Sequence, residues 1–416
     1  MGHYIDYFKT GDVHAFCKAQ ATWVTDISPR IEHIIGFIES YRDPSGLRCE
    51  WQSMVSISDP EETSKLEGLV QNAAKFIRLL LWAAPGGENG GLGPFESSTF
   101  TAPNITVVHA LAFCSSTVRD GCNLPNIRED HGGKNIVFSN RLVIKADANP
   151  LSTFVHPSEA QTLKDHGGIV YSIKNAIHEL LGHGSGRMLR ESRPGVFNFD
   201  KDKPPTNPLT GKPIQTWYKG ADTWITVFED LANTMEECRA TVVSYYLPDE
   251  KEILELFGFH DSDALEGAET PAANRDFAIF KYLLLHGEGV FKVDYDASAN
   301  TVQVSVDRSK TVSHGKPALG QLALRLHVWR SIADVESLKA FYVSLTAVDG
   351  EHEAWRQAVM SAGGEDDLVS STAVRTDAGG KIVQANTFLK DDSEVELRIY
   401  EATNEGLIRS FVEREV

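Results

Sequence analysis

The sequence predicts an α+β protein in which helices dominate and strands form a smaller portion. Two observations support this prediction. Apolar residues recur at helical spacing over much of the chain, whereas the stretch 85–150 is rich in glycine and proline and then carries short β-branched runs. The composition agrees, because 42% hydrophobic and 24% charged residues in a chain of 416 supply enough apolar surface for a large core.

In the first half of the chain, residues 12–41 are predicted to be helical. The evidence is a set of isoleucines near turn spacing: Ile27, Ile31, Ile34, Ile35 and Ile38. A second helix is expected over 61–82. Within 85–150, the runs ITVVHALAF (105–113) and NRLVIKA (140–146) predict short strands separated by loops.

In the second half, a helix over 168–184 is expected to lead into a loop over 190–220, where five prolines act as breakers. The clearest helix is predicted over 221–247. Its apolar residues alternate at spacings of four and three and so form one buried seam: Trp224, Phe228, Leu231, Met235, Cys238, Val242 and Tyr245. The remaining predicted elements are a helix at 276–286, a hairpin at 293–307, and helices at 316–347 and 401–415.

The charge balance excludes two classes of partner. Lys and Arg number 40 while Asp and Glu number 58, so the net charge is −18, and such a surface repels nucleic-acid phosphates and anionic lipids. No apolar run approaches the ~18 residues of a membrane span, and the first ten residues lack a signal-peptide pattern. Five cysteines without a CxxC pair favour a reducing compartment. We expect a cytoplasmic protein, monomeric or weakly homo-oligomeric, that binds neither nucleic acid nor membrane.

The segment HELLGH, with His178, Glu179 and His183, is the strongest indication of chemistry. Two imidazoles can bind zinc, and an adjacent carboxylate can take a proton from zinc-bound water. In the common HExxH motif the histidines lie about 40° apart around the helix axis, but a spacing of five residues places them about 140° apart. Chelation therefore requires a widened turn such as a π-bulge. Gly182 sits where that distortion would cost least.

A catalytic zinc site needs a third protein ligand and an open position for water. Glu236 and Glu237, on the helix predicted over 221–247, are adjacent carboxylates, and helical periodicity does not choose between them. Both motifs have a plain alternative: helix-surface charge for the two glutamates, and a surface helix that happens to hold two histidines for HELLGH. The Gly-Ser-Gly run at 184–186 is unusual on a purely structural helix and favours the zinc interpretation.

The sequence resembles the dipeptidyl peptidase III family of zinc metallopeptidases. The segments that carry the resemblance are GFIESYRDP (36–44), NLPN (123–126), HELLGHGSG (178–186), FNFD (197–200), EECRA (236–240), GKPAL (315–319) and GLIRSF (406–411). The resemblance spans nearly the whole chain but only the C-terminal part of the family, whose full-length members have a long N-terminal segment that forms most of a β-barrel lobe. It implies one catalytic region over 1–416. The helical zinc-binding core, at 151–350, would resemble the family's upper lobe, and 85–150 would be a remnant of the second lobe.

The resemblance also implies the catalytic residues. One zinc ion per chain would be held by His178, His183 and Glu237, and Glu179 would activate the zinc-bound water. Tyr41 matches a tyrosine whose hydroxyl supports the developing oxyanion. These five positions together make up the water-activating part of the site.

The substrate-binding positions match the family only in part. Glu39 matches a carboxylate that binds the free amino terminus of a peptide, and Asn123 and Asn126 match asparagines that bind its backbone. Gln52 stands where the family has a glutamate that helps to hold the amino terminus. Around 265–276 the chain is shortened, so a substrate-binding histidine and arginine have no clear counterparts.

The family's second-layer carboxylates, which orient the zinc histidines, are also missing. Those positions align with Ile225 and Thr241, neither of which can accept a proton or carry charge. Loss of such a partner costs about 10–100-fold in metal affinity or activity unless another group replaces it. Asp222, Glu229, Asp230 or a backbone carbonyl are the candidate replacements.

Three functions fit these residues. The first is a zinc metallo-exopeptidase, a dipeptidyl peptidase that releases dipeptides from the amino terminus of short peptides. The second is a zinc enzyme of the same ancestry that acts on a small non-peptide molecule. The third is a catalytically inactive binding module. Retention of Glu179 and Tyr41 argues against the third function, because a structural zinc site needs neither residue.

Overall fold

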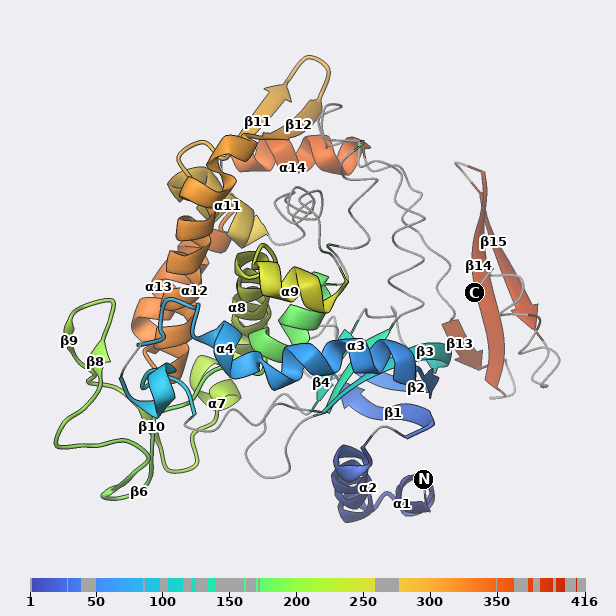
Figure 1. The fold of residues 1–416 in the computed structure, drawn as a ribbon. Coiled ribbons are helices and arrows are strands. Elements are labelled where there is room, and N and C mark those ends of the chain that lie inside the picture. The colour runs from blue at the N-terminus through green and yellow to red at the C-terminus, as the bar shows by residue number, and fades with distance from the viewer. Residues whose placement is uncertain are drawn as a thin grey trace.

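A computed structural model of the chain describes residues 2–27, 29–38, 50–84, 87–97, 104–114, 121–124, 134–138, 161, 170, 173–258, 277–348, 350–362, 373–376, 382–391, 394–400 and 409. The described elements form an α+β fold (Figure 1), as the sequence predicts. Helices make up most of the described part between residues 173 and 362, whereas the largest sheet lies near the N-terminus and a three-stranded sheet near the C-terminus.

The N-terminal part departs from the predicted long helix over 12–41. Helices α1 (Gly2–Thr10) and α2 (Val13–Thr25) come first, and the chain then enters strand β1 (Ile31–Ile38). The spacing of the isoleucines fits a helix and a strand alike. Pro29 has no backbone N–H to donate, so a helix cannot continue through it without losing a hydrogen bond. Their β-branched side chains favour a strand, and Ile31 pairs with Ile57 across the sheet.

Five strands form the sheet, in the order β1-β2-β3-β5-β4. The further strands are β2 (Glu50–Ser58), β3 (Asn104–Cys114), β4 (Gly121–Leu124) and β5 (Lys134–Phe138). Neighbours are antiparallel except β3 and β5, which are parallel. The strand predicted at 105–113 is thus confirmed as β3, whereas the run at 140–146 lies outside the described residues. The sheet extends beyond 85–150 because β1 and β2 join it.

The sheet separates two apolar cores. Successive residues of a strand point to opposite faces, and Val107 packs into the larger core while Val108 packs into the smaller one. The smaller core lies under α2, whose Trp23 is buried in it. The larger core begins with α3 (Pro60–Gln71), which packs against β3 and continues through α4 (Ala73–Ile77). The helix predicted over 61–82 is therefore two helices followed by turns.

The helix predicted over 221–247 is also interrupted. It consists of α7 (Trp224–Phe228), the 3-10 turn η5 (Glu229–Leu231) and α8 (Ala232–Tyr246). The break is at Glu229, whose φ of 49° is outside the helical region. The predicted seam still faces the core, since Met235, Cys238 and Val242 are fully buried.

Most of the remaining described elements agree with the predictions. Residues 173–177 are α-helical and continue into the π-helix η4 (His178–Gly182). The region 190–220 is a loop with short strands: β6 (Arg190–Arg193), β7 (Val196–Phe197), β8 (Thr206–Asn207), β9 (Lys212–Pro213) and β10 (Tyr218–Lys219). The predicted helix at 276–286 is α11 (Phe277–His286), and the predicted hairpin is β11 (Phe291–Asp296) with β12 (Thr301–Val306).

The helices predicted over 316–347 are α12 (Lys316–Ser331) and α13 (Val335–Thr346). Elements without a sequence prediction are η2 (Asn89–Gly91), α9 (Lys251–Leu256), η6 (Arg308–Lys310), η7 (Thr311–Gly315), α14 (Glu351–Ala362), β13 (Ala373–Thr376), β14 (Ile382–Asp391) and β15 (Glu394–Tyr400). Of the helix predicted over 401–415, only Arg409 lies within the described residues. Helix α8 is central, because it packs against η4 on one side and α12 on another.

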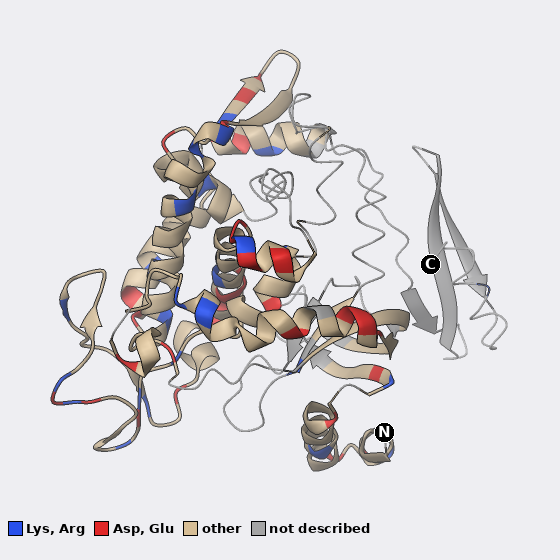
Figure 2. Ribbon diagram, in the orientation of Figure 1, with Lys and Arg blue, Asp and Glu red and all other residues tan. Residues whose placement is uncertain are grey.

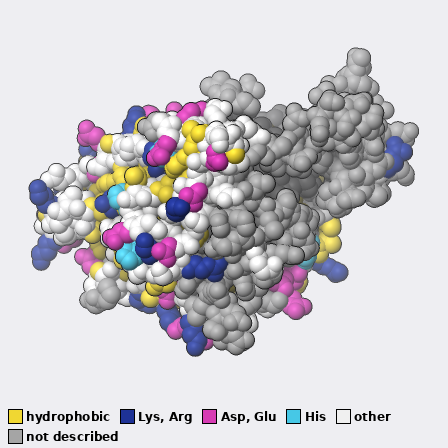
Figure 3. Space-filling view, turned by 90° about the horizontal axis from the view of Figure 1, so that it is seen from above, with side chains coloured by type: hydrophobic (Ala, Val, Ile, Leu, Met, Phe, Trp, Pro, Cys, Tyr) yellow, Lys and Arg dark blue, Asp and Glu magenta, His cyan; other side chains and the backbone are white. Residues whose placement is uncertain are grey.

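Charged residues of both signs occur along the helices and the 190–220 loop (Figure 2), and apolar, acidic and basic groups are intermixed on the described part of the face in Figure 3. None of the helices in the described part of the chain combines the length and the apolar character that crossing a membrane requires.

An ion pair is buried within the smaller core. Lys134 Nζ on β5 lies 2.6 Å from Glu32 Oε2 on β1, and neither side chain is more than 1% exposed. The other Glu32 oxygen accepts a hydrogen bond from the Trp23 indole at 2.8 Å, and Lys134 donates to the Asp26 carbonyl at 2.7 Å. The pair therefore joins α2 to two strands of the sheet, and each charge depends on the other for compensation.

Lys134→Met should destabilise the protein by about 3–5 kcal/mol, because it leaves the Glu32 carboxylate buried without its cation. Adding Glu32→Gln should recover part of this loss. Lys75→Met is the matched control, since Lys75 pairs with Glu252 at the surface and such pairs contribute up to about 1 kcal/mol. Urea unfolding compares these three variants with the wild type. Equal losses of unfolding free energy in the Lys134 and Lys75 variants would contradict the claim that Glu32 depends on Lys134 for charge compensation.

Candidate metal centre

A π-turn brings the two histidines of HELLGH together. The His183 N–H donates to the His178 carbonyl at 2.9 Å, which is a bond between residues five apart rather than four. The two imidazole rings meet edge to face with centroids 4.7 Å apart. The widened turn required by the sequence spacing is thus confirmed.

Helix α8 supplies a carboxylate opposite the two rings. Glu237 Oε2 lies 3.3 Å from His178 Nε2, and Glu237 Oε1 lies 3.6 Å from His183 Nε2. One donor atom from each residue can be chosen so that all three lie within 4.8 Å of one another. Donors about 2.0–2.2 Å from a tetrahedral zinc ion lie roughly 3.3–3.6 Å apart. This set of two imidazoles and one carboxylate therefore fits a zinc ion.

Gly182 is explained by helix packing. A Cβ there would lie 2.8 Å from both Cα and Cβ of Ala240 on α8, a distance that real side chains do not reach. The glycine thus permits the π-turn and α8 to come close enough for Glu237 to face the histidines. The Gly182 carbonyl also accepts from Arg239 at 2.8 Å and from the Ser185 hydroxyl at 3.1 Å.

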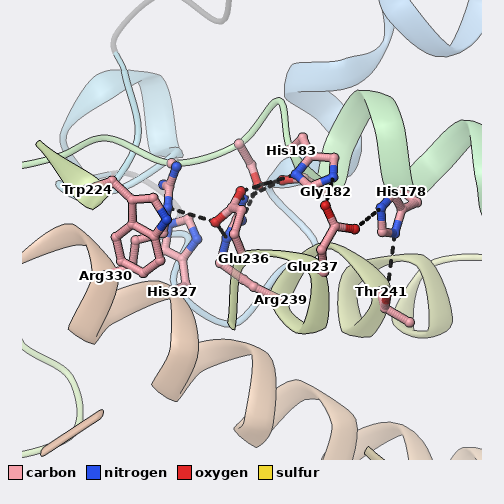
Figure 4. A network of polar contacts seen from close by, with 12 residues as sticks. His178, Gly182, His183, Trp224, Glu236, Glu237, Arg239, Thr241, His327 and Arg330 are labelled. Atoms are coloured by element: carbon pink, nitrogen blue, oxygen red, sulfur yellow. Dashed lines mark hydrogen bonds and ion pairs between the residues drawn. The ribbon is translucent and has the colours of Figure 1, made fainter. Parts of the chain in front are cut away.

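Each histidine has a partner at its other ring nitrogen (Figure 4). His183 Nδ1 lies 3.3 Å from Glu236 Oε1, and His178 Nδ1 lies 3.4 Å from Thr241 Oγ1. Such contacts fix ring orientation and leave Nε2 for a metal. The two adjacent glutamates, which periodicity could not separate, therefore occupy different positions: Glu237 beside both Nε2 atoms and Glu236 behind His183.

These contacts correct the expectation that Ile225 and Thr241 leave the two histidines without orienting partners. Thr241 contributes its hydroxyl, which can accept a hydrogen bond from the Nδ1–H group although it carries no charge. The three carboxylates considered as replacements lie elsewhere. Asp222 accepts from the Lys219 N–H at 2.9 Å, and Glu229 and Asp230 are exposed. Ile225 is 46% exposed.

Charges behind the site keep Glu236 ionised. Burial alone would raise its pKa, but Arg239 and Arg330 outweigh burial and hold the pKa of Glu236 well below its usual range. Burial likewise opposes ionisation of Glu237, yet the neighbouring His183 and His178 lower its pKa to about 2. Burial lowers the pKa of His183, and the carboxylates of Glu237, Glu236 and Glu179 reverse this and raise it.

A second buried polar group lies beyond the π-turn. Glu96 accepts from the Gly186 N–H at 2.7 Å and from the Trp82 indole at 2.8 Å, and it is 3% exposed. His327 of α12 stacks on Trp82 with centroids 3.6 Å apart and lies 3.4 Å from Glu96. Glu96 thus holds the chain three residues after His183. Burial raises its pKa to about 7.

The predicted substrate-binding residues are mostly outside the described part of the chain. Glu39 and Asn126 lie in undescribed segments, and so does Tyr41, the residue predicted to support the oxyanion. Asn123 lies in β4, where it pairs with Asn135 of β5, and β4 runs next to η4. Gln52, on β2, is 5% exposed.

Several residues that shape the site had no sequence prediction. They are Glu96, Ser185, Arg239, His327 and Arg330. Arg239 belongs to EECRA and lies three residues after Glu236, a spacing that places the two side chains together on a helix. For Glu96, His327 and Arg330 the sequence carries no local signal, because their partners are distant along the chain.

The chain is similar to known proteins in sequence and in fold. The family model of peptidase family M49 matches residues 1–270 and 267–415. Dipeptidyl peptidase 3 of Mus musculus is 34% identical over 447 residues, covering 100% of this chain and 58% of the mouse protein. The Homo sapiens protein of the same name is 33% identical with the same coverage. The chain thus spans 58% of the length of these curated relatives.

Among solved structures, that of DPP III from Caldithrix abyssi is similar in fold, with a TM-score of 0.57 and 17% sequence identity. The similarity covers 85% of this chain and 63% of that structure. It agrees with the α+β architecture described above.

The raised pKa of Glu96 predicts a pH-dependent stability. The pKa of this carboxyl group is 4.5 in the unfolded chain and about 7 in the folded protein. Between those pH values the folded state therefore binds a proton that the unfolded state does not. Its contribution is complete below pH 4.5 and is lost as pH rises through 7. Relative to Glu96→Gln, the wild type should lose about 3 kcal/mol of unfolding free energy between pH 4.5 and 8.

Urea unfolding of the two metal-free proteins across this pH range measures the difference. Other titrating groups cancel in the comparison because both chains carry them. Stability curves that stay parallel from pH 4.5 to 8 would show that Glu96 titrates alike in both states.

Proposed function

The chain belongs to peptidase family M49, and from that premise we propose that it is a zinc-dependent metallopeptidase. Its reaction would be the hydrolytic release of dipeptides from the amino terminus of short peptides. The observation that carries the proposal is the convergence of His178, His183 and Glu237 across the π-turn and α8. Two imidazoles and a carboxylate leave one position open, which is the arrangement of catalytic rather than structural zinc.

Each of the two histidine ligands has a defined partner. Thr241 orients His178 and Glu236 orients His183 at their Nδ1 atoms. A zinc ion held by the Nε2 atoms and Glu237 would polarise the scissile carbonyl and make a neighbouring water molecule more acidic. The protein's own part is to hold these donors in place and to move the proton.

Glu179 is the residue proposed to move that proton. It follows His178 directly in the π-turn and is 5% exposed. In peptide hydrolysis the water oxygen bonds to the carbonyl carbon, and the carbon–nitrogen bond then breaks. Glu179 would take the proton from the attacking water and deliver it to the leaving amine, so that it ends the cycle ionised again.

The substrate class rests on the family. The curated relatives from mouse and human are named dipeptidyl peptidase 3, and we infer the same class of reaction for this chain. Tyr41 would support the oxyanion, Glu39 would bind the peptide's amino terminus, and Asn123 and Asn126 would bind its backbone. For Asn123 the position of β4 beside η4 is consistent with this role.

The setting of the enzyme is proposed from its cysteines. Within the described residues Cys17 and Cys238 form no disulfide, which suits a reducing compartment such as the cytoplasm. A monomer or weak homo-oligomer remains our prediction.

Glu179→Gln should abolish peptide turnover, with a loss of at least about 100-fold, while zinc content stays near one per chain. Glutamine keeps the shape of the side chain but cannot take a proton. Turnover is measured on a panel of dipeptidyl-naphthylamides, and zinc by elemental analysis of the same samples. Glu255→Gln on α9, at a half-exposed position, is the control and should leave both unchanged.

Activity of the Glu179→Gln variant would contradict the proposed base. Wild-type protein with zinc fully bound and no cleavage of any peptide would instead favour a small non-peptide substrate for the same site. Wild-type protein without zinc would overturn the metal assignment itself.

A further inference from the structure

We propose that Arg330 of α12 is a positioning residue for the metal centre, acting on His183 through Glu236. The inference rests on the proposed zinc site and adds a residue to it that is remote along the chain.

Both oxygens of Glu236 are fully engaged. Oε1 lies 3.3 Å from His183 Nδ1 and 2.5 Å from Arg239 Nη2. Oε2 accepts from Arg239 Nε at 3.0 Å and forms an ion pair with Arg330 Nε at 2.8 Å. The orientation of this carboxylate therefore decides where Oε1 stands relative to His183. Arg330 contacts Glu236 Oε2, on the side of the carboxylate opposite His183 (Figure 4).

Arg330 is itself held in a fitted space. Its side chain is 12% exposed, and its guanidinium lies 5.6 Å from the centre of the Trp224 ring. Gly186, with φ of 107°, gives it room, since a Cβ there would lie 2.7 Å from Arg330 Nη1. The Tyr218 hydroxyl donates to the Arg330 carbonyl at 2.8 Å. Side chain and backbone are thus fixed from three separate segments.

The two arginines connect different parts of the site. Arg239 lies on α8 with Glu236, and its other contacts are the Ser185 hydroxyl at 3.1 Å and the Gly182 carbonyl at 2.8 Å. It therefore joins α8 to the π-turn, the two elements that already carry the three ligands. Arg330 adds the third helix, α12. Without it, Oε2 keeps only Arg239, and the carboxylate can turn about its last bond and draw Oε1 away from His183.

A double-mutant cycle on zinc affinity tests this role. Arg330→Gln should weaken zinc binding about 10-fold, the lower end of the range for outer-layer partners, as measured by competition with a chromophoric chelator. In a Glu236→Gln background the same substitution should cause no further loss, because its effect passes through that carboxylate. Arg325→Gln on the same helix is the matched control and should not change affinity.

The metal-free melting temperature of each variant provides the second readout. Arg330→Lys keeps the charge without the planar fork, so its zinc affinity should lie between those of the wild type and Arg330→Gln. If Arg330→Gln does not fold, Arg330→Lys replaces it in the cycle. Wild type that binds zinc while Arg330→Gln binds it equally well would overturn this inference alone. So would an equal loss in both backgrounds, which marks a purely structural role. Wild type that binds no zinc would overturn the proposed function as well.

Discussion

The hydrogen bond from the His183 N–H to the His178 carbonyl is the constraint on which the site depends. In a regular α-helix this N–H would bond to Glu179, and the two imidazoles would point about 140° apart. The extra residue in the turn lets both rings face α8 instead. The distortion is supported from outside, because Gly182 permits contact with Ala240 and its carbonyl receives the Arg239 guanidinium.

The support of the two histidines is unequal. His183 is backed by an ionised carboxylate that two arginines hold, whereas His178 is backed by the neutral hydroxyl of Thr241. A carboxylate partner raises the basicity of its imidazole more than a hydroxyl does. The negative charge of Glu236 is also balanced within the buried network, so the metal-facing side is left with the charge of Glu237 and of Glu179 nearby. The division of labour between Glu236 and Glu237 is therefore electrostatic as well as geometric.

Sequence reasoning predicted the α+β class and the widened turn at HELLGH, but not several element boundaries or the buried partners behind the histidines. The spacing of His178 and His183 requires a widened turn whatever surrounds it. The choice between Glu236 and Glu237 depends on how α8 is rotated against the π-turn, and the Gly182–Ala240 contact that sets it is tertiary. The isoleucines at 27–38 fit helix and strand alike, so pairing with β2 decided the outcome. The seam over 224–245 was predicted correctly, yet it does not record the change of direction at Glu229. Arg330 is beyond sequence reasoning because its partners lie on other helices.

Zinc K-edge X-ray absorption of the protein loaded with one zinc ion per chain tests the central claim most directly. The structure predicts a shell of nitrogen and oxygen donors at about 2.0–2.2 Å with the multiple-scattering signature of two imidazoles. A Glu237→Gln sample should lose affinity and keep the imidazole signature. A shell containing sulfur at about 2.3 Å, or one with fewer than two imidazoles, would contradict the account.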